Sequence, residues 1–147
     1  MARKIEESMT NLKIKIGDLM FIGCLETEKA PVTTARFLDL LPYSQKLVHV
    51  RWSGEGCWIP LGDNKFSLPY ENHTSHPAPG QFIFYPGGYS ETEILLAYGG
   101  VSFSSKLGQL AGNHFLTIVG GLAQLPEVGR RTLWEGAQDI TFSILGD

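Results

Sequence analysis

The chain has 147 residues and a formal net charge of −3, a length that suits one domain with a substantial core. Hydrophobic residues make up 43% and charged residues 18%, which is typical of a globular rather than a disordered chain. The 12 Lys and Arg residues are scattered, so the basic stripe of a nucleic-acid-binding protein is missing. Apolar stretches reach about seven residues, against the ~20 needed to cross a bilayer. Because the N-terminus also lacks the apolar block of a signal peptide, we expect a cytoplasmic protein without membrane contacts.

The N-terminal part of the chain predicts a paired strand unit. Residues 1–10 are polar and are expected to be frayed, which leaves residues 11–147 as a single domain. Residues 11–17 alternate apolar and charged side chains, the pattern of a half-buried strand. Residues 19–25 predict a second strand that pairs with the first across the turn between them.

A helix and a hairpin are predicted next. Pro31 suits the first turn of a helix, and apolar residues near helical spacing up to Leu41 predict about three turns. Pro42 ends the segment. Residues 47–52 and 56–61 then predict two strands joined by a glycine-rich connection.

The second half of the chain is dominated by strands. A polar, proline-containing insertion over residues 61–79 predicts a long loop, which is uncommon in compact domains unless it is functional or mobile. After it, strands are predicted at residues 80–85, 93–98, 115–119 and 137–145, with a short helix at 122–128. About eight short strands, two helices and 17 glycines predict a mainly β protein: a small closed β-barrel whose helices cap its open ends.

Several segments resemble the cyclophilin-type peptidyl-prolyl isomerases in order and spacing. They are Ala-Pro-Val-Thr at 30–33 followed by Phe37, Leu-Val-His-Val-Arg at 47–51, Gly-Asn-His-Phe within 112–121, and the closing segment 137–144. This resemblance implies a cyclophilin-like barrel and places Arg51 at the position of the isomerase arginine.

A second set of motifs is similar to an uncharacterised bacterial family with a cyclophilin-like fold and no established activity. The matching stretches are Arg-Trp-Ser-Gly-Glu at 51–55, Glu-Asn at 71–72, Pro-Ala-Pro-Gly at 77–80, Glu-Thr-Glu at 91–93, Ala-Tyr-Gly at 97–99, Gly-Asn-His-Phe at 112–115 and Trp-Glu-Gly-Ala at 134–137. This resemblance implies the same fold and leaves the function open.

The sequence departs from the isomerases around the arginine. The isomerases have adjacent histidine and arginine, whereas Val50 separates His49 from Arg51 here, which places both side chains on one face of a strand. The strand over residues 56–61 also lacks the glutamine and the double glycine that line the proline pocket of that family.

Arg51 is the candidate for isomerase chemistry. Prolyl isomerisation is opposed by amide resonance of ~18–20 kcal/mol, and a guanidinium that donates to the prolyl nitrogen weakens that resonance. Trp52, Trp58 and Phe82 are then candidate walls of the proline pocket. The alternative is a structural arginine that pairs with a glutamate and lays its stem along the barrel.

Two tryptophans flank the predicted hairpin. Trp52 and Trp58 stand on either side of Glu55. Tryptophan in a sheet usually packs in the core, but exposed indoles beside a carboxylate suit a sugar, an aromatic or a cationic ligand.

Carboxylates and histidines in the later half are candidates for polar chemistry. Glu91 and Glu93 lie on one side of a strand or turn and are suited to acid–base work if burial separates their pKa values. His114 is either a structural histidine or a partner of that site. His73 and His76, with Glu71, would form a metal site only if an irregular loop aimed them together, so a solvated loop is favoured and no metal is expected.

Motifs for bound cofactors or a nucleophile are missing from the sequence. It contains no nucleophile elbow, phosphate loop or dinucleotide fingerprint, so we expect no cofactor. Cys24 and Cys57 lie in apolar contexts and are expected to be reduced core thiols.

The leading hypothesis is a protein that binds a small molecule or peptide in a polar-aromatic cleft. The candidate lining residues are Arg51, Trp52, Glu55, Trp58, Glu71, Glu93 and His114. Three alternatives stay open: a prolyl isomerase acting through Arg51, a small-metabolite enzyme acting through Glu91, Glu93 or His114, and a non-catalytic subunit that forms a homo-oligomer.

Overall fold

The computed structural model describes residues 11–146. It contains two α-helices, α2 (Pro31–Leu38) and α3 (Leu125–Trp134), with a 3₁₀ turn η1 (Leu122–Gln124) before α3. The longer strands are β1 (Asn11–Ile16), β2 (Leu19–Leu25), β3 (Tyr43–His49), β4 (Gly54–Gly62), β6 (Gln81–Tyr85), β7 (Thr92–Val101), β10 (Gly112–Gly120) and β11 (Gln138–Ile144). The short strands are β5 (His73–Thr74), β8 (Ser104–Ser105) and β9 (Gly108–Gln109).

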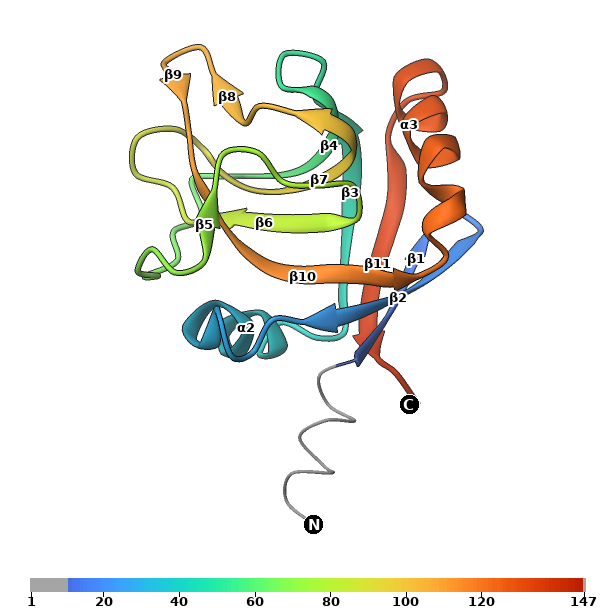
Figure 1. The fold of residues 1–147 in the computed structure, drawn as a ribbon, viewed down its shortest axis with the longest axis horizontal. Helices are drawn as coiled ribbons and strands as arrows, with labels where there is room; N and C mark the ends of the chain where they lie inside the picture. Colours follow the sequence, from blue (N-terminus) through green and yellow to red (C-terminus); the bar gives the residue numbers. More distant parts are fainter. Residues whose placement is uncertain (1–10, 147) are drawn as a thin grey trace.

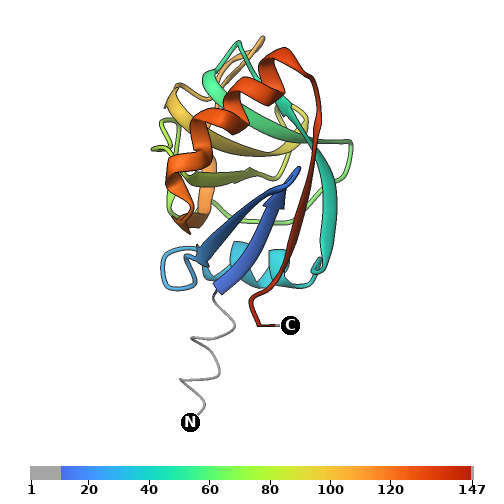
Figure 2. The same ribbon diagram turned by 90° about the vertical axis from the view of Figure 1, so that its right-hand side faces the viewer.

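Eight antiparallel strands close into a barrel. Their order is β2-β1-β11-β3-β4-β7-β6-β10, and β10 pairs again with β2 to complete the ring. Figure 1 shows α2 near one end of the barrel, and Figure 2 shows α3 running across the other. The expectation of a mainly β protein with a small closed barrel of about eight strands and two helices is confirmed.

The alternating pattern of the strands fills the barrel interior. In β1, Leu12, Ile14 and Ile16 are buried while Lys13 and Lys15 are exposed. The interior also holds a group of aromatic rings that includes Phe37 of α2, Phe82, Phe84, Phe115 and Phe142. Phe37 is the residue by which α2 closes its end of the barrel.

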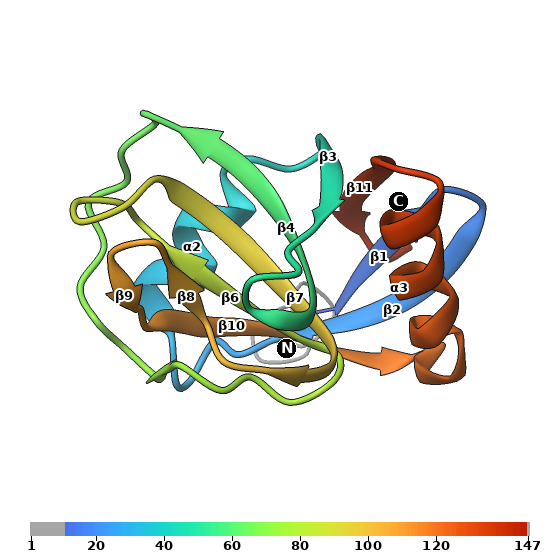
Figure 3. The same cartoon turned by 90° about the horizontal axis from the view of Figure 1, so that it is seen from above.

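A second apolar cluster lies outside the barrel wall. Ile83, Leu95 and Ala97 point outward from β6 and β7, because their neighbours in sequence point into the interior. The segment that follows β7 folds back over this outer face and adds Phe103 and Leu110 to the cluster. Figure 3 shows its β8–β9 hairpin lying above β6, β7 and β10. The sequence did not predict this hairpin.

Several predicted boundaries differ from the structure. Helix α2 ends at Leu38 rather than near Leu41, because the chain tightens into i→i+3 turns such as Leu40 N to Phe37 O. The helix predicted at residues 122–128 extends instead to Trp134, after a 3₁₀ start. The expected fraying of residues 1–10 lies outside the described residues. Within the described part of the chain, neither helix has the length and apolar character needed to cross a membrane.

Candidate functional site

Trp52 and Trp58 meet on the outer face of the barrel, as the predicted aromatic lining requires. Their ring centroids lie 5.5 Å apart in a T-shaped arrangement. Trp58 is partly buried against the outer cluster, whereas Trp52, in the turn between β3 and β4, is 58% exposed. The pair therefore combines an anchored indole with one that is free to meet a ligand.

Glu93 lies on the same outer face, close to Trp58. Pro60 of β4 and Tyr85 of β6 are its cross-strand partners, and Trp58 is paired with Leu95, two residues further along β7. Since side chains two apart on a strand share a face, Trp58 and Glu93 are diagonal neighbours, with Cα atoms ~7–8 Å apart. The interior face at this point is taken by Ile59 and Ile94.

The Glu93 side chain is buried without a partner. It is 5% exposed, and its carboxyl group has no hydrogen bond or ion pair with any described residue. Among residues 11–146, His49 Nδ1 is the one side-chain polar atom that is both fully buried and without a hydrogen-bond partner. The unpartnered Glu93 carboxyl is therefore not fully buried and keeps a narrow contact with solvent. Burial, reinforced by the negative charge of Glu91, raises the pKa of Glu93 to about 8. At neutral pH Glu93 is therefore mainly a neutral acid that can donate a hydrogen bond.

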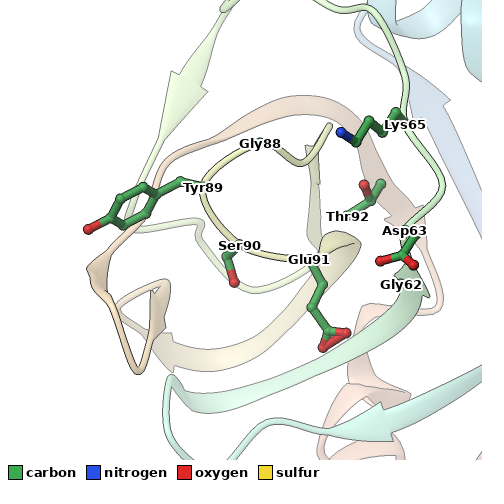
Figure 4. A pocket seen from close by; sticks show the side chains of 8 residues that line it. All are labelled: Gly62, Asp63, Lys65, Gly88, Tyr89, Ser90, Glu91 and Thr92. Atoms are coloured by element: carbon green, nitrogen blue, oxygen red, sulfur yellow. The ribbon is translucent and has the colours of Figure 1, made fainter.

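The turn that carries Glu91 is fixed above this position. The Tyr85 hydroxyl accepts hydrogen bonds from Tyr89 N (3.1 Å) and Ser90 N (3.0 Å). The same turn borders a pocket of about 300 Å³ lined by Gly62, Asp63, Lys65, Gly88, Tyr89, Ser90, Glu91 and Thr92. Figure 4 shows Lys65 and Asp63 on one side of this pocket and Ser90 and Glu91 extending from the turn. We call Trp52, Trp58, Glu91 and Glu93 together the Glu93 site.

Arg51 does not occupy the strand position that was predicted for it. Strand β3 ends at His49, Val50 turns into the outer cluster, and Arg51 is exposed in the turn that follows. It forms no ion pair with a described carboxylate. The positive charge of Arg51 acts on His49: the pKa of His49 is lowered mainly by burial and further by the charge of Arg51. The prediction that His49 and Arg51 share one face of a strand is wrong, because the strand stops before Arg51.

Glu55 is hydrogen-bonded to the end of β7. One of its carboxyl oxygens accepts a hydrogen bond from Gly100 N (3.0 Å), and its side chain lies directly against Gly99. A side chain at position 99 would collide with Glu55, so this glycine allows the close approach. Glu55 therefore ties the start of β4 to the end of β7.

Glu71 closes the N-terminus of α2 instead of lining the Glu93 site. Its carboxylate accepts hydrogen bonds from Thr33 N (2.7 Å) and Val32 N (3.3 Å). Its own backbone N–H donates to the Asn113 side chain (3.2 Å), which also donates to Thr33 Oγ1 (3.0 Å). A carboxylate at a helix N-terminus satisfies the free N–H groups and the helix dipole.

His114 shares the outer face of the barrel with Trp58 but stands far from it. The cross-strand row runs Trp58, Leu95, Ile83, His114, which is three strand spacings or ~14 Å. His114 Nε2 is 2.7 Å from Thr117 Oγ1, and Thr117 donates to Glu26 (2.7 Å). Burial lowers the pKa of His114 despite the nearby Glu26. The seven predicted residues therefore divide into the indole pair with Glu93, the turn residue Arg51, the Glu55 contact, and a separate region around Glu71 and His114.

Two polar arrangements were missed by the sequence reasoning. Asn113 is fully buried and joins Glu71 to Thr33, as described above. Under α3, His49 Nε2 lies 2.8 Å from the Tyr98 hydroxyl, and Cys57 Sγ lies 3.2 Å from Thr132 Oγ1. A glycine at 129 in α3, where a side chain would collide with the Tyr98 ring, is the one sequence signal for this packing.

The two histidines of the long loop, His73 and His76, contact different parts of the chain. His73 packs against the Tyr70 ring at a centroid distance of 4.8 Å, while His76 Nδ1 lies 3.4 Å from Val101 O. Within residues 11–146, no group of three or more His, Cys, Asp or Glu residues is arranged to hold a metal ion. The buried Cys57 is a free thiol.

Comparison with solved structures supports the fold. McbB, solved in complex with tryptophan, is 18% identical with a TM-score of 0.67; the match covers 92% of this chain and 45% of McbB. The hypothetical protein AF2241 from Archaeoglobus fulgidus, solved in solution, is 12% identical with a TM-score of 0.52, covering 94% of this chain and 96% of that protein. The chain thus spans less than half the length of McbB, and at these identities the likeness is one of fold.

Comparison of sequences identifies the family. No curated protein matches the chain. A family model described as "Protein of unknown function (DUF3830)" matches residues 12–144, nearly the whole described barrel. The chain therefore belongs to the DUF3830 family.

Proposed function

We propose that this protein binds a small aromatic molecule at the Glu93 site, on the outer face of β4 and β7. The single observation that carries the proposal is the Glu93 carboxyl, which is 5% exposed and has no protein partner. Burying a polar group without a hydrogen bond costs roughly 1–3 kcal/mol. A ligand that supplies the missing hydrogen bond recovers that cost.

The indole pair supports an aromatic ligand. Trp58 is anchored in the outer cluster and Trp52 is mostly exposed, so a flat ring can stack on the open indole without displacing the core. The fold relative McbB was solved with tryptophan, itself an indole compound, which agrees with a ligand of this class.

The adjoining pocket supports a small ligand. Its volume of about 300 Å³ lies at the lower end of typical ligand sites, and Glu91 belongs both to its lining and to the surroundings of Glu93. A molecule placed on the indoles can therefore extend a polar group past Glu91.

Binding of indole to the ¹⁵N-labelled protein tests this proposal. The chain has three tryptophans, and each gives one side-chain N–H signal in a heteronuclear NMR spectrum. We expect indole to shift the signals of Trp52 and Trp58 and to leave Trp134, which is 77% exposed on α3, unchanged. Trp58→Ala is expected to weaken binding at least about 10-fold, because Trp52 packs on Trp58 and loses the position in which the ligand ring stacks on it, and an aromatic contact contributes ~0.5–1.5 kcal/mol beyond its buried area.

Trp134→Ala is the matched control, because it removes an exposed indole from a different element. Equal shifts at all three tryptophans, or an affinity that Trp58→Ala leaves intact, would contradict the proposal.

A second candidate function is acid–base catalysis on the same ligand. It is favoured by the pKa of about 8 at Glu93, since an acid that titrates near neutral pH transfers protons efficiently. Native mass spectrometry of the purified protein, followed by identification of any retained metabolite, distinguishes a ligand held unchanged from one that is converted.

The remaining expectations stay predictions. These are the resemblance to a bacterial family of cyclophilin-like fold and the cytoplasmic location. Prolyl isomerisation has less support than ligand binding, because Arg51 is exposed in a turn rather than held over a pocket wall. Homo-oligomer formation is supported by an exposed apolar patch where β2 meets β10, made of Met20, Ile22, Val119, Leu122 and Leu145.

A further inference from the structure

Two cations lie near the Glu93 site, Lys65 in the pocket that Glu91 also lines and Arg51 beside Trp52, but neither forms an ion pair with a carboxyl group of the site. Glu91 and Glu93 lie close enough that the charge of Glu91 raises the pKa of Glu93, yet neither residue has an ion pair with a described lysine or arginine. The strands on either side bring no compensating charge: β4 presents Trp58 and Pro60 on this face, and β6 presents Tyr85. The hydroxyl of Tyr85 is already used to hold the turn.

Such a site is expected to bind a cationic ligand more tightly than an anionic one. An anionic ligand would meet Glu91 and would also keep Glu93 protonated. An ammonium group would supply the positive charge that both carboxyl groups lack and would form a charge-assisted hydrogen bond with Glu93. The faces of the indoles carry negative partial charge and attract a cation within ~6 Å.

We infer that the natural ligand of the Glu93 site is a cationic aromatic amine, with its ring on the indoles and its ammonium group between Glu91 and Glu93. This inference rests on the proposed function and adds the charge class of the ligand. The buried, unpartnered carboxyl is the observation that points to a ligand group. Because no lysine or arginine of the described chain forms an ion pair with Glu91 or Glu93, we assign that group a positive charge.

Proton release accompanies binding of such a ligand. With a pKa of about 8, Glu93 is about nine-tenths protonated at pH 7 and must lose its proton to pair with an ammonium ion. We therefore expect about 0.9 proton to be released for each amine bound at pH 7. The affinity for the amine should rise between pH 6 and pH 8 and level off above that range.

The test compares three indole compounds that differ in charge: tryptamine, the neutral alcohol tryptophol, and indole-3-acetate. Calorimetry at pH 7 in two buffers with different ionisation enthalpies gives the affinity and the number of protons released. We expect tryptamine to bind at least about 10-fold more tightly than tryptophol, and indole-3-acetate to bind most weakly. Glu93→Gln, which keeps the shape of the protonated side chain, should abolish the proton release and most of the preference for tryptamine.

Glu28→Gln provides the matched control, since Glu28 is an exposed glutamate in the segment before α2. Equal affinities for the three compounds, all reduced by Trp58→Ala, would overturn the inference about charge and leave the aromatic site standing. Binding that neither Trp58→Ala nor Glu93→Gln alters would overturn the proposed function itself.

Discussion

Glu93→Gln is expected to make the protein more stable than the wild type at pH 8, by roughly 4 kcal/mol, while the two proteins have nearly equal stability at pH 4.5. The reason is that the folded state holds Glu93 in its neutral form. Its pKa rises from 4.5 to about 8, first because of burial and then because of Glu91. Glutamine has a similar shape and never ionises.

The direction of the effect follows from proton binding in the two states. Between pH 4.5 and pH 8 the unfolded chain has lost the Glu93 proton while the folded protein retains it, so the wild type loses stability as the pH rises. The difference is fully developed once the pH passes the folded pKa of about 8.

Two histidines change the stability with pH in the opposite direction, so the wild type must be compared with Glu93→Gln at each pH. Burial lowers the pKa values of His49 and His114, which destabilises the folded state as the pH falls below about 6.5. Both histidines are present in the wild type and in Glu93→Gln, so their effects cancel in the difference. Urea unfolding of both proteins at pH 4.5, 6.5 and 8 measures this difference in the free energy of unfolding, and a difference that does not change with pH would contradict a neutral Glu93.

Glu71→Ala is expected to lower the free energy of unfolding by about 2 kcal/mol and to leave ligand affinity unchanged. Removing the carboxylate leaves the N–H groups of Val32 and Thr33 without their acceptor at the start of α2. Helix caps contribute ~0.5–2 kcal/mol and hydrogen bonds to charged groups ~1.5–3 kcal/mol. Helix α2 carries Phe37 into the barrel interior, so the loss is transmitted to the core.

Glu28→Ala removes an exposed glutamate from the same region and should change stability by less than about 0.5 kcal/mol. Chemical denaturation gives the stabilities, and indole titration of the folded variants gives the affinities. A Glu71→Ala protein with wild-type stability and weakened indole binding would return Glu71 to the binding site.

The barrel could be predicted from the sequence because period-two alternation marks which side chains enter the core. Residues 11–16 show this directly, with three buried apolar side chains between lysines and Asn11. Pro31 likewise predicted the first turn of α2. Its C-terminus was harder to place, since the apolar spacing continues to Leu41 after the helical hydrogen bonds have ended at Leu38.

The residues that surround Glu93 could not be predicted from the alternation of apolar and polar side chains along each strand. The pattern shows that Glu93 faces away from Ile94, but it does not show that Pro60 and Tyr85 flank it or that Trp58 is its diagonal neighbour. Those relations come from strand register. Arg51 was misplaced because the apolar run through Val50 looks like a continuing strand, whereas Val50 in fact packs into the outer cluster as the chain turns. Glu71 and His114 were predicted to lie with the indoles because they belong to family-like motifs. Such motifs do not show how far apart their residues lie in the folded protein.

A carbon-13 NMR titration of the glutamate carboxyl groups, with Glu93 assigned by comparison with Glu93→Gln, measures the protonation of this side chain directly. We predict a midpoint near pH 8 in the free protein and a shift to lower pH when tryptamine is added. A midpoint near 4.5 in the free protein would show an ordinary surface glutamate and would contradict the account of the site.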